Sequence, residues 1–205
     1  MILGAGGHAK VILDILESRD DVLLAGYVNP CGDSEPLYGL PRLGDDSGLP
    51  DLFGQGIRAA FVAIGDNALR KERTKTLSRI GYRVINAISP NACISRYAKL
   101  GAGVAVMPGA VVNASAALGD GAIVNTNASV DHDCVIGAFA HIGPGVSIAA
   151  RVSVGEGVLL GAGSCVIPGV GIGDWTVAGA GSVVVRDLPS RVVAYGTPAR
   201  PQGRR

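Results

Sequence analysis

The three histidines of the chain, His8, His132 and His141, are the first candidates for chemistry, and two of them lie in the apolar stretch ASVDHDCVIGAFAHIG. His132 stands between Asp131 and Asp133. An imidazole exchanges protons near neutral pH, and a carboxylate bonded to its other ring nitrogen fixes the tautomer and stabilises the imidazolium. The triplet predicts a general base that removes a proton during a reaction. A solvated polar turn is the alternative interpretation.

The segment GAGGHA near the N-terminus is a second candidate, because it fits the pattern G-x-G-x-x-G/A through Gly4, Gly6 and Ala9. It follows a short apolar segment and precedes a helix-like one, as in a dinucleotide-binding turn. Backbone N–H groups at a helix N-terminus attract phosphate, which predicts a phosphate-bearing ligand. NAD is not expected, because Asn29 and Pro30 stand where the ribose-binding acid would be. A tight turn without a ligand is the alternative.

A repeat of six residues indicates the elements that position the triplet. From Ile94 to Val184, sixteen successive positions spaced by six carry fifteen aliphatic residues and Ala178. This period is typical of a parallel β-helix, in which each hexad forms one short strand and one turn. The aliphatic residue should point inward with a small residue four positions later beside it. The glycine that often follows the aliphatic residue should permit the tight corner.

The hexad that contains the triplet keeps the phase of the repeat. Val130 and Cys134 occupy its two inward positions, so Cys134 is expected to pack in the core. Asp131, His132 and Asp133 are then expected in the outer positions at the turn. The fold leaves these positions free, so a polar triplet does not interrupt the apolar repeat.

Residues 1–90 have a different pattern and predict a small Rossmann-like parallel α/β sheet. The segments MIL, VLLAGYV, AAFVAIG and YRVINAI predict strands, and VILDILES and NALRKERTKTLSRIG predict helices. AIGDN, residues 63–67, should face the same crevice as the glycine-rich loop, where His8 fits a turn-stabilising and a phosphate-facing role equally. The boundary near SPNACIS assigns residues 91–205 to the β-helix and to a segment that closes its last coil. The chain starts only three residues before Gly4, which leaves open whether the opening strand has further residues upstream.

The composition excludes several classes of function. Hydrophobic residues make up 48% and charged residues 17%, which is typical of a globular protein. Lys plus Arg number 18 against 17 for Asp plus Glu, which gives no electrostatic basis for binding nucleic acid or an anionic membrane. No apolar run is long enough to span a bilayer, so a cytoplasmic protein is expected. The four cysteines show no metal-ligand spacing, so free thiols and no metal are expected.

Several segments together, GAGGHAKV, AIGDN, NTNASVDHDC, GAFAHIGPGV and GTPAR, resemble the PglD/NeuD-type hexapeptide-repeat sugar acyltransferases over nearly the whole chain. The likeness is strongest to N-acetyltransferases of a nucleotide-linked 4-amino-4,6-dideoxy sugar, such as the perosamine and bacillosamine-precursor enzymes. The resemblance implies a left-handed β-helix with three hexads in each coil. It also implies a homotrimer, with the nucleotide sugar on the α/β domain and acetyl-CoA along the β-helix between neighbouring subunits.

The resemblance also implies roles for individual residues. His132 matches the catalytic base, and Asp133 matches the acid that raises its basicity. Acetyl-CoA contacts are implied for Asn125, His141, Ala150, Gly161 and Ala162. Nucleotide-sugar contacts are implied for Gly6, Gly7, His8, Asn29, Pro30 and Gly65. Family members often carry two acids where this chain has Asn29 and Pro30, so the sugar and the nucleotide base stay open. The arginines of the C-terminal segment suit CoA phosphates or plain solvation.

Two other functions stay open from the sequence. One is an O-acetyltransferase that acts on a sugar of the sialic-acid type or on a serine hydroxyl, and the other is a non-catalytic trimeric scaffold. The repeat adds a geometric expectation, because His141 lies half a coil beyond His132 and therefore on a different side of the triangle. A site that uses both histidines is expected to take His132 from one subunit and His141 from the next.

Overall fold

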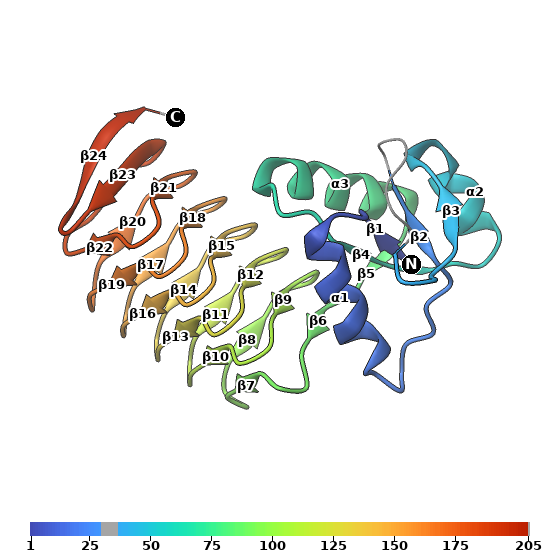
Figure 1. Ribbon diagram of the computed structural model, residues 1–205, viewed down its shortest axis with the longest axis horizontal. Coiled ribbons are helices and arrows are strands. Elements are labelled where there is room, and N and C mark those ends of the chain that lie inside the picture. Colours follow the sequence, from blue (N-terminus) through green and yellow to red (C-terminus); the bar gives the residue numbers. More distant parts are fainter. Residues whose placement is uncertain (30–36, 205) are drawn as a thin grey trace.

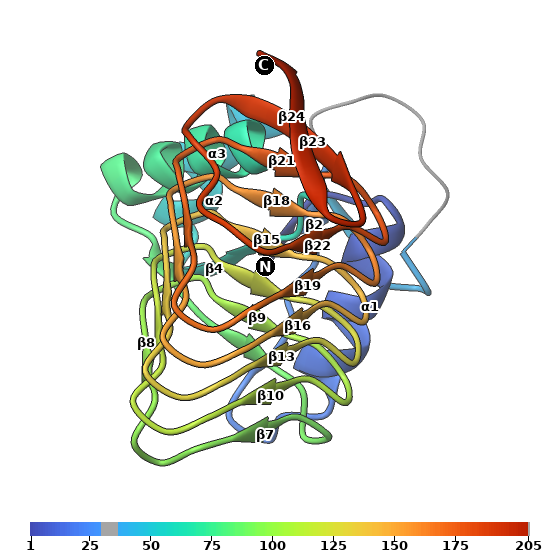
Figure 2. The ribbon, with the colours of Figure 1, turned by 90° about the vertical axis from the view of Figure 1, so that its left-hand side faces the viewer.

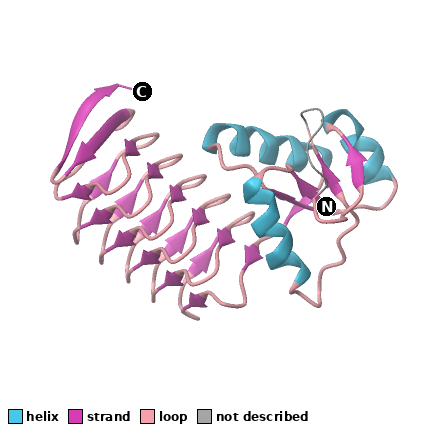
Figure 3. Ribbon diagram, viewed as in Figure 1, coloured by secondary structure: helices cyan, strands magenta, loops and turns pink. Residues whose placement is uncertain are grey.

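The computed structural model describes residues 1–29 and 37–204 and shows a small α/β sheet beside a stack of short parallel strands (Figure 1). The helices of the described residues all belong to the N-terminal part of the chain (Figure 3). None of these helices is long and apolar enough to cross a bilayer. The predicted fold class, an α/β sheet followed by a parallel β-helix, is confirmed. Pro30, expected at the nucleotide-sugar site, lies outside the described residues.

The N-terminal sheet is parallel throughout, with its strands in the order β3-β2-β1-β4-β5. The strands are β1 (Ile2–Leu3), β2 (Tyr27–Val28), β3 (Arg42–Gly44), β4 (Ala59–Val62) and β5 (Arg83–Val84). The helices are α1 (Gly7–Glu17), α2 (Leu49–Gly54) and α3 (Asn67–Ile80), with a 3-10 turn (Asp46–Gly48) before α2. The sequence pattern missed β3 and α2, because both are too short to show a hydrophobic period.

Two predicted strands are shorter than expected. Only the last two residues of VLLAGYV form a strand, β2. The segment YRVINAI is divided: β5 belongs to the α/β sheet, and β6 (Ala87–Ile88) pairs instead with β9 (Ala105–Val106) of the β-helix. The first coil of the β-helix therefore begins at Ala87.

Helices α1 and α3 connect the two parts of the molecule. The apolar face of α1 includes Ile12 and Leu16, which pack in one cluster with Ala105, Met107 and Ile123 on the outside of the β-helix. This packing buries the outer surface of the first coils. Helix α3 begins where the Asp66 side chain accepts the N–H of Leu69 at 2.8 Å, and ends at Gly81 in the left-handed region with φ 108°.

The β-helix has three walls, and each strand pairs in parallel with the strand one coil further on (Figure 2). The first wall contains β7 (Cys93–Ile94), β10 (Val111–Val112), β13 (Ser129–Val130), β16 (Ser147–Ile148), β19 (Cys165–Val166) and β22 (Val183–Val184). The second contains β8 (Lys99–Leu100), β11 (Ala117–Leu118), β14 (Val135–Ile136), β17 (Ser153–Val154) and β20 (Gly171–Ile172). The third begins with β6 and β9 and continues with β12 (Ile123–Val124), β15 (His141–Ile142), β18 (Leu159–Leu160) and β21 (Val177–Ala178).

The inward row is the one that the sequence repeat predicted. Each strand from β7 to β22 ends on one of the sixteen positions spaced by six. Their side chains and the small residues four positions later form one continuous buried cluster. Cys134 is fully buried in this cluster, which confirms its packing role.

The glycines that follow the inward aliphatic residues have a role different from the predicted one. A Cβ at Gly137 would lie 2.5 Å from the carbonyl carbon of Gly155, and a Cβ at Gly143 would lie 2.4 Å from the carbonyl oxygen of Leu160. Neither glycine has a positive φ. These glycines are therefore required because successive coils approach closely, and the expectation that they permit the corner is wrong.

The corner itself is formed two residues after each of these glycines, at a position with positive φ that recurs every six residues. Glycines such as Gly145 (φ 64°) often fill it, but Asn127, Asp133 and Phe139 adopt the same conformation, with φ of 56°, 60° and 57°. Positive φ costs a residue with a Cβ a modest amount of conformational energy. The conformation of Asp133 thus belongs to the repeat and is not specific to one site.

A β-hairpin ends the chain. Strand β23 (Val192–Gly196) pairs in parallel with β21, and β24 (Ala199–Arg204) pairs with β23 in the opposite direction. The hairpin extends the third wall beyond the last coil (Figure 1). Leu188 bridges to Ile172 and covers the end of the core.

Candidate functional site

His132 and Asp133 lie on the turn between β13 and β14, where the chain passes from the first wall to the second. The distance from His132 Nδ1 to Asp133 Oδ2 is 2.7 Å. A carboxylate only accepts, so Nδ1 carries the proton and Nε2 keeps its lone pair. Among the described residues none bonds to Nε2. The side chains are 48% and 53% exposed, so the pair is accessible to a ligand, and its predicted outer position is confirmed.

The two acids beside His132 make different contacts. An oxygen of Asp131 accepts the backbone N–H of His132 at 2.7 Å and the side-chain N–H of Asn113, one coil earlier, at 2.9 Å. These two bonds hold the pKa of Asp131 below its usual range, and the bond from the His132 N–H has the larger effect. Asp131 therefore organises the turn, and Asp133 binds the imidazole.

Small residues stand next to His132 along the stack. Ala114 and Ala150 occupy the same corner position one coil earlier and one coil later. Backbone bonds fix this column, because Asp133 N–H donates to the Ala114 carbonyl and Arg151 N–H donates to the His132 carbonyl, both at 3.1 Å. With only methyl groups above and below, the imidazole is not covered. Ala150, expected to contact acetyl-CoA, is thus placed next to the proposed base.

The glycine-rich loop forms one side of a pocket of about 340 Å³ at the carboxyl ends of β1 and β4. Its lining residues are Gly4, Ala5, Gly6, Gly7, His8, Asn29, Ala63, Ile64, Gly65 and Leu69. Gly4 has φ 116°, and a Cβ there would lie 2.7 Å from the Ala63 carbonyl oxygen, so only glycine fits between the two strands. The first N–H groups of α1 have no partner within the helix and point toward this end of the sheet.

His141 lies on the outside of the third wall, close to this pocket. Its Nε2 is 2.9 Å from Asn125 Nδ2, and its ring lies close to the Gly65 carbonyl. The Thr126 N–H donates to Asn125 Oδ1 at 2.8 Å, which orients the amide so that its NH2 group faces His141. Nε2 of His141 is therefore the acceptor, and Nδ1 carries the proton.

Two neutral imidazoles thus stand together at the junction of the two parts. The ring centroids of His8 and His141 are 6.5 Å apart. Burial, the larger cause, lowers the pKa of each to about 4 together with nearby positive charge, from His141 and Arg70 on His8 and from Arg70 on His141. Nε2 of His8 is buried without a hydrogen-bond partner among the described residues, so it is available to a ligand.

The structure gathers the expected site residues into separate groups. Gly6, Gly7, His8, Asn29 and Gly65 line the pocket, and Asn125 and His141 adjoin it. His132, Asp133 and Ala150 lie on the corner between the first and second walls. Gly161 and Ala162 follow β18, on the corner between the third and first walls. Within one chain, His132 and His141 therefore belong to different sides of the β-helix, as expected from their spacing.

Arg70 is a buried polar residue at this junction that the sequence interpretation missed, and Asn67, the last residue of AIGDN, is buried beside it. Arg70 is 1% exposed and Asn67 is 5% exposed. Both lie in the first turns of α3, and both bind backbone carbonyl groups of the β-helix. The only sequence signal is their place directly after AIGD in an otherwise solvated, charged helix.

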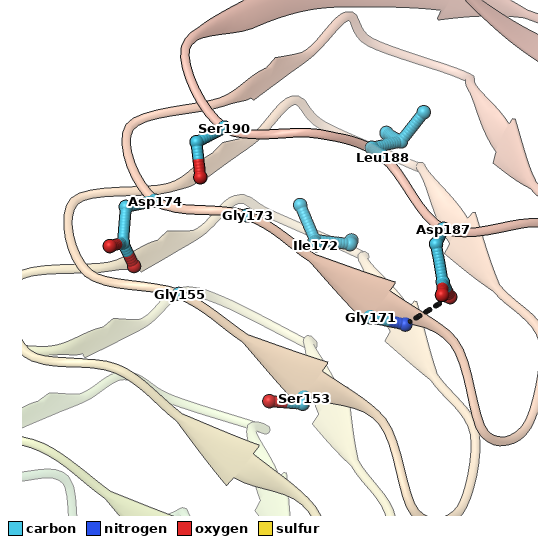
Figure 4. Close-up of a pocket in the computed structure, with 9 residues that line it drawn as sticks. All are labelled: Ser153, Gly155, Gly171, Ile172, Gly173, Asp174, Asp187, Leu188 and Ser190. Carbon is cyan, nitrogen blue, oxygen red and sulfur yellow. Dashed lines mark hydrogen bonds between the residues drawn. The ribbon is translucent and has the colours of Figure 1, made fainter.

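A groove of about 450 Å³ near the end of the second wall does not fit the expected chemistry (Figure 4). Its two carboxylates, Asp174 and Asp187, accept the backbone N–H groups of Glu156 and Gly171 at 2.8 and 2.7 Å. It contains no histidine, and its negative charge disfavours phosphate groups.

Comparisons with known proteins agree with this arrangement. Residues 1–77 match the family described as the PglD N-terminal domain. The chain is 48% identical to PerB from Caulobacter crescentus, solved in complex with CoA and GDP-perosamine, with a TM-score of 0.93 over 98% of this chain and 96% of that one. The chain belongs to the PglD-type family of sugar N-acetyltransferases.

Two other proteins are also similar to this chain. The acetyltransferase domain of PglB from Neisseria gonorrhoeae FA1090 is 35% identical, with a TM-score of 0.90 over 98% of this chain and 97% of that one. UDP-N-acetylbacillosamine N-acetyltransferase of Bacillus subtilis (strain 168) is 36% identical over 113 residues, which are 52% of this chain. That alignment spans half of the Bacillus protein.

Two further structures of the Caulobacter enzyme carry single histidine replacements, one to alanine and one to asparagine. Both were also solved in complex with CoA and GDP-perosamine. Both complexes are therefore formed without the side chain of that histidine.

Proposed function

We propose that this family member transfers the acetyl group of acetyl-CoA to the 4-amino group of a nucleotide-linked amino-deoxy sugar. The observation that carries the proposal is the exposed His132–Asp133 pair, with Nδ1 bound at 2.7 Å and the Nε2 lone pair free. It occurs in a chain 48% identical to an enzyme solved with CoA and GDP-perosamine. Acetyl-CoA supplies the activated acetyl group, and no protein nucleophile is needed.

The proposed mechanism uses the two residues as a base and its partner. As the neutral sugar amine adds to the thioester carbonyl, a new C–N bond forms and the nitrogen becomes positively charged. His132 Nε2 removes that N–H proton, and Asp133 stabilises the imidazolium through Nδ1. When the C–S bond breaks, the sulfur leaves with the electron pair and His132 returns the proton to it. The products are the sugar amide and CoA, so charge and protons balance.

The positions of the groups support a site shared between subunits. We place the nucleotide sugar in the pocket of Gly6, Gly7, His8, Asn29 and Gly65, at the helix N-terminus that suits phosphate. Acetyl-CoA would run along the β-helix past Asn125, His141, Ala150, Gly161 and Ala162. Because His132 and His141 lie on different sides of one chain, a homotrimer would bring His132 of one subunit to the pocket of the next.

The alternatives receive less support. The relatives whose reaction is named, from Caulobacter and from Bacillus subtilis, are N-acetyltransferases. An amine acceptor is therefore favoured over a sugar or serine hydroxyl. A non-catalytic scaffold would leave the hydrogen-bonded His132–Asp133 pair without a role.

A thiol-release assay tests the proposal. Purified protein is incubated with acetyl-CoA and a panel of GDP-, UDP- and dTDP-linked 4-amino sugars, with the corresponding 4-hydroxy sugars as controls. Mass spectrometry should show an acetyl group on the amine of at least one 4-amino sugar. Acetylation of only the hydroxy sugars, or no acetylation in any sample, would overturn the proposal.

A further inference from the structure

Helix α3 lies across one column of turns on the β-helix, at the corner where the second wall passes into the third. Gly121, Phe139, Gly157 and Trp175 occupy this column in four successive coils. The first turns of α3 carry three residues that reach these coils: Asn67, Arg70 and Lys71. The helix therefore ties the α/β part to several coils at once.

Arg70 makes the most extensive of these contacts. Its Nε donates to the Gly121 carbonyl at 2.9 Å, and one Nη donates to the Phe139 carbonyl and to Asn67 Oδ1, both at 2.8 Å. The other Nη donates to the carbonyls of Ile64 and Gly65 at 3.0 and 3.1 Å. All five guanidinium donors are used, a set that only arginine supplies.

The electrostatic setting of Arg70 is unusual. Burial lowers its pKa to about 10, so the group remains charged at neutral pH. Among the described residues it forms no ion pair with a carboxylate, and its partners are four carbonyl groups and one amide. A buried, unpaired cation costs free energy that a merely structural contact does not require. This cost suggests that the charge and geometry serve the neighbouring site.

Gly65 connects Arg70 to that site. Its carbonyl accepts a donor of Arg70 at 3.1 Å and also lies close to the His141 ring. Phe139, which Arg70 binds from the other side, is only two residues before His141 in the chain. Arg70 therefore holds both the carbonyl that lies close to the His141 ring and the strand that carries the ring.

We propose that Arg70 is a positioning residue of the acetyl-transfer site. It fixes the edge of the sugar-nucleotide pocket at Gly65 against the wall that carries His141, and so supports the Nδ1–H tautomer that the Asn125 amide also favours. The claim rests on the proposed function where it concerns the rate, but its structural part concerns the unliganded protein alone. It explains why the guanidinium spans three separate segments.

Lys71 offers a matched control on the same helix. It forms an ion pair with Glu156 and lies 5.4 Å from the centre of the Trp175 ring, so it also ties α3 to the β-helix. It contacts neither Gly65 nor Phe139, the two residues that link Arg70 to His141. Lys71→Met should weaken the junction without changing the alignment at Gly65.

The first measurement is the tautomer of His141 by 15N NMR of the imidazole nitrogens. The three histidine signals are assigned by replacing each histidine with glutamine. The wild type should show a protonated Nδ1, and Arg70→Lys should show a mixture of tautomers, because lysine has fewer donors in a different geometry. If the wild type shows the Nε2–H tautomer, the proposal is wrong, and no variant is needed to show this. If Arg70→Lys shows the same tautomer as the wild type, the proposal is also wrong.

The second measurement separates positioning from stability. Arg70→Lys should lower kcat by about tenfold, because small misalignments at a reacting centre have effects of this size or more. KM for acetyl-CoA should stay within about twofold of the wild type, because the wall itself is intact. Lys71→Met should keep kcat within about twofold. Equal losses of kcat in both variants at equal losses of Tm would mean that Arg70 is only structural.

The two proposals fail in different ways. If the wild type acetylates no amino sugar, the proposed function is wrong, and the tautomer measurement still tests Arg70. If the wild type is active and Arg70→Lys retains wild-type kcat, the positioning role is wrong and the proposed function stands.

Discussion

At the scale of residues, the site depends on two histidines in opposite settings. His132 is half exposed and bound to a carboxylate, whereas His141 is buried near a cation and bound to an amide. A carboxylate partner stabilises a protonated ring, and a nearby cation destabilises it. The first setting suits proton transfer, and the second suits a neutral ring of fixed orientation.

His132→Gln should lower the rate of acetyl transfer by about a hundredfold or more, since a general base contributes on that order. The free energy of unfolding should change little, because the side chain is half exposed. Steady-state kinetics and a thermal melt measure both. A near-normal rate for His132→Gln would remove it from the role of base.

The buried pair His8 and His141 predicts a dependence of stability on pH. The pKa of each is about 4 in the folded state against 6.5 in the unfolded state. The unfolded state therefore binds more protons between these values, so stability is full above about pH 6.5 and falls as the pH drops toward 4. Each histidine contributes a slope of at most about 1.4 kcal/mol per pH unit.

Urea unfolding at several pH values measures this slope. In His8→Gln the loss of stability between pH 6.5 and 4 should be smaller than in the wild type, because one of the two groups is removed. A wild type that is equally stable at both ends of this range would show that the histidines are not held neutral.

At the scale of elements, the two kinds of glycine in the repeat predict different costs of substitution. Gly137→Ala would place a Cβ 2.5 Å from the backbone of the next coil, whereas a Cβ at Gly145 meets nothing within 4 Å. The first change should destabilise the protein by about 3 kcal/mol or more, because backbone must move. The second should cost only about 1 kcal/mol, for its positive φ. Chemical denaturation of both variants tests the difference.

The elements also show what is predictable from the sequence. The register of sixteen strands and the outer position of His132 follow from the spacing alone, because each hexad repeats the same local geometry. The role of Gly137 does not follow, since a short distance between coils leaves no trace within one hexad. The contacts of Arg70 join residues far apart in the chain, and nothing local to α3 specifies them.

At the scale of the whole molecule, the separation of His132 and His141 predicts complementation between chains. His132→Gln and His141→Gln chains, co-expressed with different tags, should form mixed assemblies that recover about a third of the wild-type activity. In a trimer that contains both chains, one of the three interfaces has both native histidines, if each interface takes one from each chain. Assemblies of a single variant are the controls.

The mixed sample is purified over both tags before the assay, and its mass is measured by light scattering. No recovery above the single variants, in an assembly that contains both chains, would place both histidines of each site within one subunit. A monomer in solution would contradict the shared site directly.

Because α3 crosses four coils, it affects the order in which parts of the protein unfold. In a solenoid each coil contacts only its neighbours, so unfolding can begin at any free end and proceed coil by coil. Here the contacts of residues 67–71 bind coils up to Trp175 into one cooperative unit with the α/β sheet. The coil beyond Trp175 and the hairpin of β23 and β24 lie outside this unit. Amide hydrogens there should exchange with solvent first, while those between Gly121 and Gly157 should exchange together and last.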